Sequence, residues 1–194
     1  MHSEKMNGVD SLTSAISSAS AMGESMDAQG VYKVQCFEYE GGPLLWEDTF
    51  DNVACTAGKN LALDTILAGS AYTVTGPYMG LISSVSYSAT AAADTMASHA
   101  GWTEAGSTNA PTFAARIAPA WSAASAGAKA TSAAVSFTMT GAGTLVGAFM
   151  VFGPGAVTTL MSTAGTLLSA GAFSGGNQVV SLGNVVNVSY SLSV

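Results

Sequence analysis

Side chains that could carry nucleophilic or acid–base chemistry are few and widely spaced. His99 is the only histidine outside the first ten residues, so any Ser–His–acid system would have to use it. The nearest approach to a nucleophile elbow is AFSGG around Ser174. It lacks the first glycine of G-x-S-x-G and falls between two expected strands, not between a strand and a helix. We therefore expect a polar turn at Ser174.

Residues that could hold a metal ion or a phosphate do not follow known motifs either. No ligand spacing relates four candidates, which are His2, Cys36, Cys55 and His99. Asp48 and Asp51 are close in sequence, but we expect them at the start of a helix, where acids complement the helix dipole. GAGTLVG is not G-x-G-x-x-G, and no P-loop lysine follows it. The sequence predicts no enzyme activity, no cofactor and no metal.

The only arginine, Arg116, has few acids nearby in sequence. It could pair with Glu104, with Asp94 or with an acid from the expected helix, because a guanidinium matches a carboxylate at two points. One alternative is a structural ion pair within the chain. The other is a contact to a partner protein, and Arg116 therefore counts among the candidate partner-binding residues.

The chain of 194 residues is poor in charge, with 9 % charged residues and a net charge of −7. An average soluble chain has about 25 % charged residues. Phosphate binding needs clustered Lys and Arg, so we expect no nucleic-acid partner. A surface with so little charge is badly equipped to stay dispersed alone. This favours a surface covered by copies or partners over one solvated only by Ser and Thr.

The most apolar run, residues 145–152, is followed by GPG at residues 153–155. A helix needs about 20 apolar residues to cross a bilayer, so a buried strand is the better interpretation and no membrane is expected. MHSEKMNGVD at the N-terminus has acids and no apolar core, unlike a signal peptide. We expect synthesis in the cytoplasm and a reduced pair of cysteines.

Residues 1–30 are predicted to form an arm with a short helix, since Val9, Leu12 and Ile16 recur at helical spacing. An isolated helix this short is marginal in water. We expect it to be held by a neighbouring subunit, with docking on its own domain as the alternative. The candidate partner-binding residues of the arm are Val9, Leu12, Ile16, Met22 and Met26.

Residues 31–194 are predicted to form one mainly β domain. Residues 31–40 alternate as a strand, and one helix is expected near residues 48–68. From residue 72 onward, short strands alternate with turn signals, which favours an antiparallel β-sandwich. Residues 89–130 have little periodicity and are expected to be ordered loops with short extended pieces.

Two later segments give the clearest strand patterns. Residues 133–140 alternate, and after the turn GAG the apolar run 145–152 is expected to complete a hairpin. The final strand, VVNVSYSLSV, is expected to turn Val186, Val188, Tyr190, Leu192 and Val194 to the core. Its outer face carries Asn and Ser without charge, so the strand is either central or covered by a neighbouring chain.

The order of several segments resembles small structural proteins of tailed bacteriophages. They are LLWEDTFDNVACTAGKNLALDTILAGS, GWTEAG, PTFAARIAPAW, AAVSFTMTGAGTLVGAFMVF and the closing GNVVNVSYSLSV, and the likeness covers roughly residues 46–194. The resemblance implies a jelly-roll β-sandwich on the virion, without catalysis. It implies a capsid decoration or cement protein on the head exterior that binds the major capsid protein and further copies of itself as a dimer or trimer.

A tail or head-fibre component that recognises a host receptor or glycan is the alternative. Trp102 and Trp121 are the candidates for stacking on a sugar, although both could equally be core residues.

Overall fold

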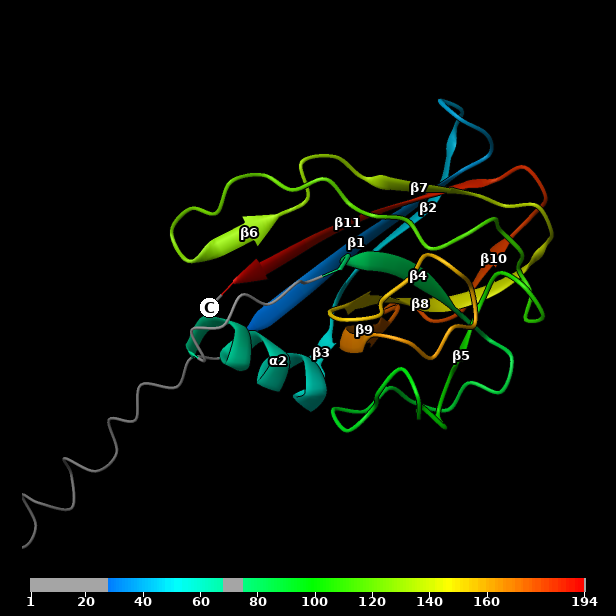
Figure 1. Cartoon of the computed structure of the whole chain (residues 1–194). Helices are drawn as coiled ribbons and strands as arrows, with labels where there is room; N and C mark the ends of the chain where they lie inside the picture. Colours follow the sequence, from blue (N-terminus) through cyan, green and yellow to red (C-terminus); the bar gives the residue numbers. More distant parts are fainter. Residues whose placement is uncertain (1–27, 68–74, 194) are drawn as a thin grey trace, which may run out of the picture.

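The computed structural model describes residues 28–67 and 75–193, which form two antiparallel β-sheets packed together with a helix beside them (Figure 1). In chain order the elements are β1 (Gln29–Phe37), β2 (Leu44–Asp51), β3 (Val53–Ala54), α2 (Thr56–Leu67), β4 (Tyr78–Ser83), β5 (Thr103–Glu104), β6 (Ala128–Ala130), β7 (Val135–Thr138), β8 (Gly143–Phe152), β9 (Thr166–Ala172), β10 (Gln178–Val180) and β11 (Val185–Ser193). The predicted mainly β, antiparallel sandwich with one helix is therefore confirmed.

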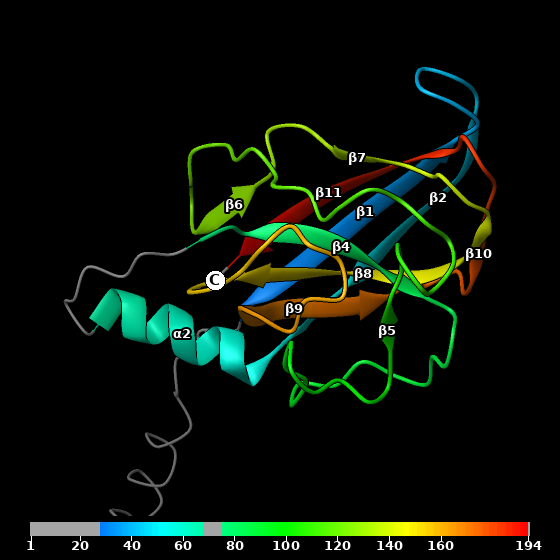
Figure 2. The same ribbon diagram turned by 45° about the vertical axis from the view of Figure 1, so that its right-hand side comes forward.

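The first sheet has the order β2-β1-β11-β6, and β7 also pairs with β11. The second has the order β3-β9-β8-β4-β5, and β10 also pairs with β8. Figure 2 shows the sheets as two layers, with α2 beside β9 at one end of the second sheet. The chain changes sheet from β2 to β3, from β5 to β6, from β7 to β8 and from β10 to β11. These crossings tie the two layers together.

The first sheet turns one face to the core and the other to solvent, and its strands alternate accordingly. In β1, the side chains of Tyr32, Val34 and Cys36 are fully buried. β11 pairs with β1 over its whole length, and Val186 and Val188 are buried as predicted. Because β1 lies on one side of β11 and β6 and β7 lie on the other, β11 is a central strand. The first of the two sequence alternatives therefore holds: β11 is central, and it needs no charged side chains to protect an exposed edge.

The second sheet is buried on both faces, because α2 and long loops cover the face turned away from the sandwich core. In β8, Leu145 and Met150 belong to the cluster between the sheets, whereas Phe149 and Val151 belong to a second cluster on the far face. A strand buried on both sides forms a continuous apolar run without alternation. This explains the unbroken apolar sequence of residues 145–152.

The helix predicted near residues 48–68 begins later than predicted. Its expected first turn is the strand β2, in which Asp48 and Phe50 are buried and Phe50 lies opposite Tyr32 of β1. Asp48 and Asp51 therefore do not cap α2. The reason is tertiary: the period of two in β2 matches the pairing edge of β1, and packing overrides local helix preference.

The predicted hairpin of residues 133–140 with the run 145–152 is wrong. β7 pairs with β11 in the first sheet, whereas β8 pairs with β4, β9 and β10 in the second. The turn at residues 141–143 carries the chain from one layer to the other. Both strands bury apolar side chains in the core between the sheets, β7 from the first sheet and β8 from the second. Alternation shows that a strand has one buried face, but it does not show to which sheet the strand belongs.

The strand β1 begins two residues before the predicted domain boundary, because Gln29 already pairs with Ser193 of β11. The chain thus enters the domain beside the closing strand, at the α2 end of the sandwich (Figure 1). The predicted arm, apart from residues 28–30, lies outside the described residues. So do the last core residue predicted for the closing strand, Val194, and most of the strand expected at residues 72–75.

Candidate functional site

Arg116 forms a two-point ion pair with Glu104 in the interior. Its Nε donates to Oε1 and its Nη2 donates to Oε2, both at 2.8 Å. Nη2 also donates to the carbonyl of Ser162 at 2.8 Å, and Nη1 donates to that of Val157 at 3.4 Å. The guanidinium carbon lies 5.5 Å from the ring centroid of Phe149. All three guanidinium nitrogens are thus engaged within the chain.

The ion pair holds two long loops against the second sheet. Glu104 lies on β5, and its Oε2 also accepts a hydrogen bond from the backbone N of Met161 at 2.7 Å. The side chain of Arg116 has 0 % exposed surface. The structure therefore shows the intramolecular pair among the sequence alternatives. The prediction that Arg116 contacts a partner does not hold for this domain, because its side chain reaches no surface.

A cavity of about 190 Å³ opens beside the ion pair. Its polar groups also hold the loops: His99 Nδ1 lies 2.9 Å from the carbonyl of Trp102, and Asn109 Nδ2 donates to the carbonyl of Glu104 at 3.1 Å. The arrangement is a clamp between loops. The charged groups at its centre are already paired with each other.

Trp102 lies in the core on the far face of the second sheet, with 1 % of its surface exposed. Its ring stacks on His99 with centroids 3.9 Å apart, and its Nε1 donates to Asp94 at 2.9 Å. Stacking of Trp102 on a glycan is therefore excluded in this fold, because the ring has no free face. Trp121 is half-buried with its ring edge-on to Tyr190, and it keeps some exposed surface.

Cys36 and Cys55 are both buried free thiols, as the sequence predicted. Cys36 belongs to the cluster between the sheets, and Cys55 belongs to the cluster on the far face of the second sheet. Burial raises the pKa of each thiol to about 11. The thiolate is the reactive form, so both groups are inert near neutral pH.

Residues 28–67 and 75–193 contain neither a cluster of metal-ligating side chains nor a helix that could span a membrane. Within these ranges no three His, Cys, Asp or Glu side chains are grouped as metal ligands. In the same ranges no helix is long and apolar enough to cross a membrane. The predicted partner-binding residues of the arm lie outside the described part; they are Val9, Leu12, Ile16, Met22 and Met26.

Five large apolar side chains are exposed on β2, on β10 and on the turns beside them, at the end of the sandwich opposite α2 (Figure 1), and we call this region the apolar tip. They are Tyr39, Leu44, Leu45, Val179 and Leu182, with exposed fractions between 46 % and 71 %. Monomeric domains seldom gather exposed apolar side chains in one place unless they bind something there. The apolar tip is therefore the strongest candidate for an interaction surface among the described residues.

Hydrogen bonds join the segments that form the apolar tip. Trp46 Nε1 on β2 donates to the carbonyl of Val179 on β10 at 3.2 Å. Asn184 Nδ2, just before β11, donates to the carbonyl of Glu38 at 3.0 Å. The first bond links β2 to β10, and the second links the β1–β2 connection to the turn that carries Leu182. The tip is thus a preformed surface.

Acids border the apolar tip. Glu38, Glu40 and Glu47 are all exposed beside it. Glu47 accepts a hydrogen bond from Gln35 at 3.0 Å and lies 3.5 Å from Lys33 Nζ, and both contacts hold the pKa of its carboxyl below the usual value. An apolar centre with a charged rim is the ordinary anatomy of a protein–protein contact. A partner would need basic groups around an apolar centre.

A smaller apolar group lies on the outer side of α2. Leu63, Ile66 and Leu67 are 52 %, 74 % and 76 % exposed. They sit at i, i+3 and i+4, so they share one side of the helix. The opposite side packs on β9 through Gly58 and Leu61.

Sequence reasoning missed the apolar tip for an identifiable reason. Leu44 and Leu45 lie just before the segment that was assigned to a helix, where an apolar pair is unremarkable. Leu182 is the leucine of the turn sequence SLGN, residues 181–184. Turns favour Gly, Asn and Ser, so an apolar residue within one is the signal that could have revealed this surface. Val179 alternates with buried Val180, so its exposure follows from the strand pattern alone.

No family model matches this chain, and no curated protein matches it.

Proposed function

We propose that the chain is a non-enzymatic structural protein of a tailed-bacteriophage particle, and that it is a capsid decoration or cement protein on the outside of the head. The observation that carries this proposal is the apolar tip, a preformed surface of five exposed apolar side chains with an acidic border. The order of sequence segments over residues 46–194, which resembles such proteins, supports the same function.

In this proposal the partner is the major capsid protein, with further copies of the chain as neighbours on the particle. A contact made at the end of a narrow sandwich is modest in area. On a symmetric shell the same contact recurs many times, and linked contacts reinforce one another. The uncharged outer face of β11 then suits close packing against other protein.

The test is a binding assay on heads that lack the chain. Wild-type protein is compared with Val179→Asp/Leu182→Asp, which puts charge into the apolar tip. The matched control is Val85→Asp, since Val85 is an exposed valine (43 %) on another connection. We expect the tip variant to bind at least about tenfold more weakly, because buried charge without a partner costs several kcal/mol. The control variant should bind as the wild type does.

Electron microscopy of intact particles decides the location. Density for the chain on the head exterior, lost in the tip variant, supports the proposal. Density on a fibre or at the tail tip would instead favour receptor recognition, with Trp121 as the residue to test on a glycan array. Absence of the chain from purified particles would overturn both.

A further inference from the structure

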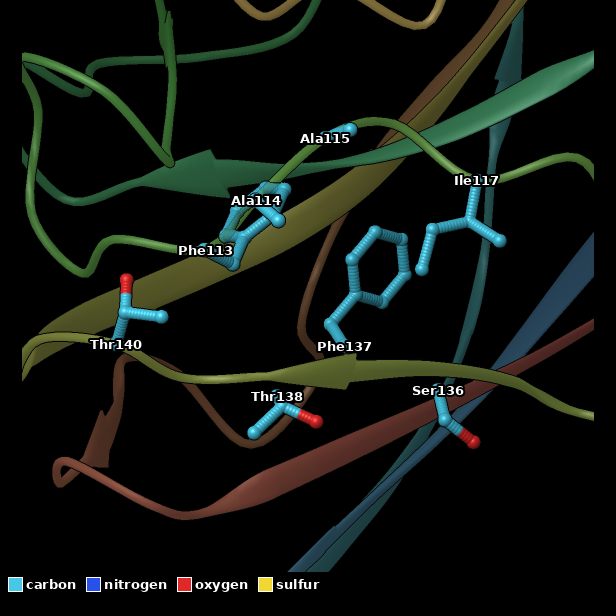
Figure 3. A pocket seen from close by; sticks show the side chains of 8 residues that line it. All are labelled: Phe113, Ala114, Ala115, Ile117, Ser136, Phe137, Thr138 and Thr140. Atoms are coloured by element: carbon cyan, nitrogen blue, oxygen red, sulfur yellow. The ribbon is translucent and has the colours of Figure 1, made fainter.

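A groove of about 260 Å³ separates β7 from residues 112–121, which we call the side segment (Figure 3). Phe137 and Ile117 point toward each other across the groove, whereas Ser136 and Thr138 point away from it. All the side chains that line it are uncharged. The groove is thus a gap between two stretches of the same chain, with an apolar interior.

The side segment is bonded to the chain around β7 at both ends of the groove. At one end, Thr140 donates its backbone N–H to the carbonyl of Thr112 at 2.8 Å. At the other end, Ser132 donates its backbone N–H to the carbonyl of Ala120 at 2.9 Å. The bridges at these two ends are antiparallel. The side segment therefore begins and ends as an antiparallel neighbour of β7, and it leaves β7 only in between.

The two ends share one register. Eight residues lead from Thr112 to Ala120, and eight lead from Ser132 to Thr140. In an antiparallel pair every second residue exchanges both of its backbone hydrogen bonds with the residue opposite. Continued between the ends, this register contains three further pairs, which are Ala114 with Thr138, Arg116 with Ser136 and Ala118 with Ala134. These pairs could form without a bulge or a slip of either segment.

β7 has unpaired backbone groups at the positions that these pairs require. It pairs with β11 on one side, and on that side Met139 donates its backbone N–H to the carbonyl of Asn184. Successive residues of a strand turn their backbone groups to alternate sides. Ser136 and Thr138 therefore turn theirs into the groove, where no residue of the described ranges pairs with them.

The side segment also has the side-chain pattern of a half-buried strand. Every second residue is buried or half-buried, and these are Phe113, Ala115, Ile117, Pro119 and Trp121. Between them, Ala114, Ala118 and Ala120 are exposed, as on the solvent side of a strand. Arg116 breaks the pattern, because its position belongs to the exposed set although its side chain is 1 % exposed.

Contacts in the middle of the side segment hold it away from β7. The backbone N–H of Arg116 donates to the carbonyl of Thr158 at 2.9 Å, and Ile117 exchanges two backbone hydrogen bonds with Met79 of β4. The guanidinium of Arg116 makes its two bonds to Glu104, both at 2.8 Å. The middle of the segment thus belongs to the second sheet, whereas its ends belong to the first.

We propose that the side segment is a two-state strand, which the Arg116–Glu104 pair keeps open and which closes onto β7 when that pair is removed. In the closed state the three missing pairs form, Arg116 turns outward beside Ser136, and the groove is filled. Closing breaks the backbone bonds to Thr158 and Met79 but forms more backbone bonds along β7. The buried ion pair is therefore the contact that makes the open state the more stable one.

Closing would also release the loop that Arg116 holds. The carbonyls of Val157, Thr158 and Ser162 now accept hydrogen bonds from this one residue. The groove and this loop are thus coupled, since one residue cannot serve both sheets. This inference goes beyond the proposed function and does not depend on it.

Amide hydrogen exchange of the full chain tests this inference. Arg116→Thr/Glu104→Leu removes the buried pair and places a residue that favours strands at the outward position. The matched control is Lys33→Thr/Glu47→Leu, which removes an exposed ion pair of the first sheet. We expect the amides of Ser136 and Thr138 to exchange at least about tenfold more slowly in the Arg116/Glu104 variant than in the wild type. In the control they should exchange as in the wild type.

Unchanged exchange at Ser136 and Thr138 in the Arg116/Glu104 variant would overturn the inference. So would equal slowing in the control, or amides that are already as slow in the wild type, because the side segment would then not be the cause of the protection.

A disulfide in the otherwise unchanged chain keeps the test independent of how well the Arg116/Glu104 variant folds. Ala114→Cys/Thr138→Cys places two cysteines opposite each other in the closed state, with their Cα atoms about 5.5 Å apart. In the control Ala114→Cys/Ala134→Cys, four residues of strand separate the same two levels, about 13 Å.

Under mild oxidation we expect an intrachain bond in the first variant and none in the control, and the bonded form should show slow exchange at Ser136. A bond in neither variant, an equal yield in both, or a bond that leaves Ser136 unprotected would contradict the closed state. Cys36 and Cys55 are buried and do not interfere.

Discussion

Arg116 and Glu104 depend on each other, because both are withdrawn from water. Glu104 is 3 % exposed, and without the guanidinium only the backbone N of Met161 would remain as a donor to its carboxylate. Losing one member of a buried ion pair is costly, whereas replacing both members with apolar groups of similar volume is often close to neutral. Stability therefore depends less on the attraction between the two charges than on both partners being present.

Arg116→Met should lower the free energy of unfolding by about 3–5 kcal/mol, because it leaves a buried carboxylate uncompensated. The double variant Arg116→Met/Glu104→Leu should recover at least half of this loss. Urea unfolding followed by circular dichroism measures both. A loss below about 1 kcal/mol in the single variant would mean that water reaches Glu104.

The buried thiols of Cys36 and Cys55 make stability sensitive to alkaline pH. Their pKa rises from 9.0 to about 11 on folding, so the protonated thiol is favoured in the folded state. Their contribution to stability is present below pH 9 and is lost as the pH rises toward 11. The urea midpoint should fall over this range, and it should fall less in Cys36→Ala/Cys55→Ala. A thiol reagent at pH 7.5 should react with the wild type only after unfolding.

At the scale of elements, α2 depends on how closely it approaches β9. Gly58 is buried, and a Cβ at this position would lie 2.7 Å from the Cα of Leu168. That is closer than carbon atoms pack in protein interiors. The helix therefore needs glycine on its packed side, although glycine weakens a helix in isolation.

Gly58→Ala should destabilise the protein by about 1–3 kcal/mol, since the added methyl group overpacks the contact with β9. Asn60→Ala, an exposed position on the same helix, should change stability by less than about 0.5 kcal/mol. Thermal unfolding of the two variants compares the positions. Equal effects would show that α2 shifts freely on β9.

The elements that could be predicted from the sequence are those whose apolar residues follow a clear pattern. The alternation of β1 and β11, and the unbroken apolar run of β8, follow from how many faces of each strand are buried. β2 was assigned to a helix because its acids and apolar residues fit both periods, and only its pairing with β1 decides between them. The same holds for the hairpin: alternation gives the buried face of β7 and β8 but not the sheet to which each belongs.

At the scale of the whole molecule, the two layers are not equally protected from solvent. The first sheet exposes one face, whereas the second is covered on both by the core, α2 and the loops that Arg116 and Glu104 hold together. The candidate surface could be predicted less well than the fold. The apolar tip joins residues near position 40 to residues near position 180, and no local pattern reports such a distant contact.

Native-state hydrogen exchange should reveal this difference between the layers. We expect the amides of β8 to exchange only through global unfolding, because β8 is central and covered on both faces. The amides of β6, a short strand at the edge of the first sheet, should exchange about a hundredfold faster or more through local opening. Mass spectrometry of peptic fragments measures both. Similar rates for β6 and β8 would indicate that the layers open together.

The apolar tip and the end of the closing strand lie at opposite ends of the sandwich, separated by the nine residues of β11. Nine residues of an extended strand span about 30 Å. A fluorescent protein or an antigen fused after the last residue would thus stand clear of whatever binds the tip. The same separation would let the chain serve as a two-ended adaptor, with cargo carried at one end and attachment left free at the other.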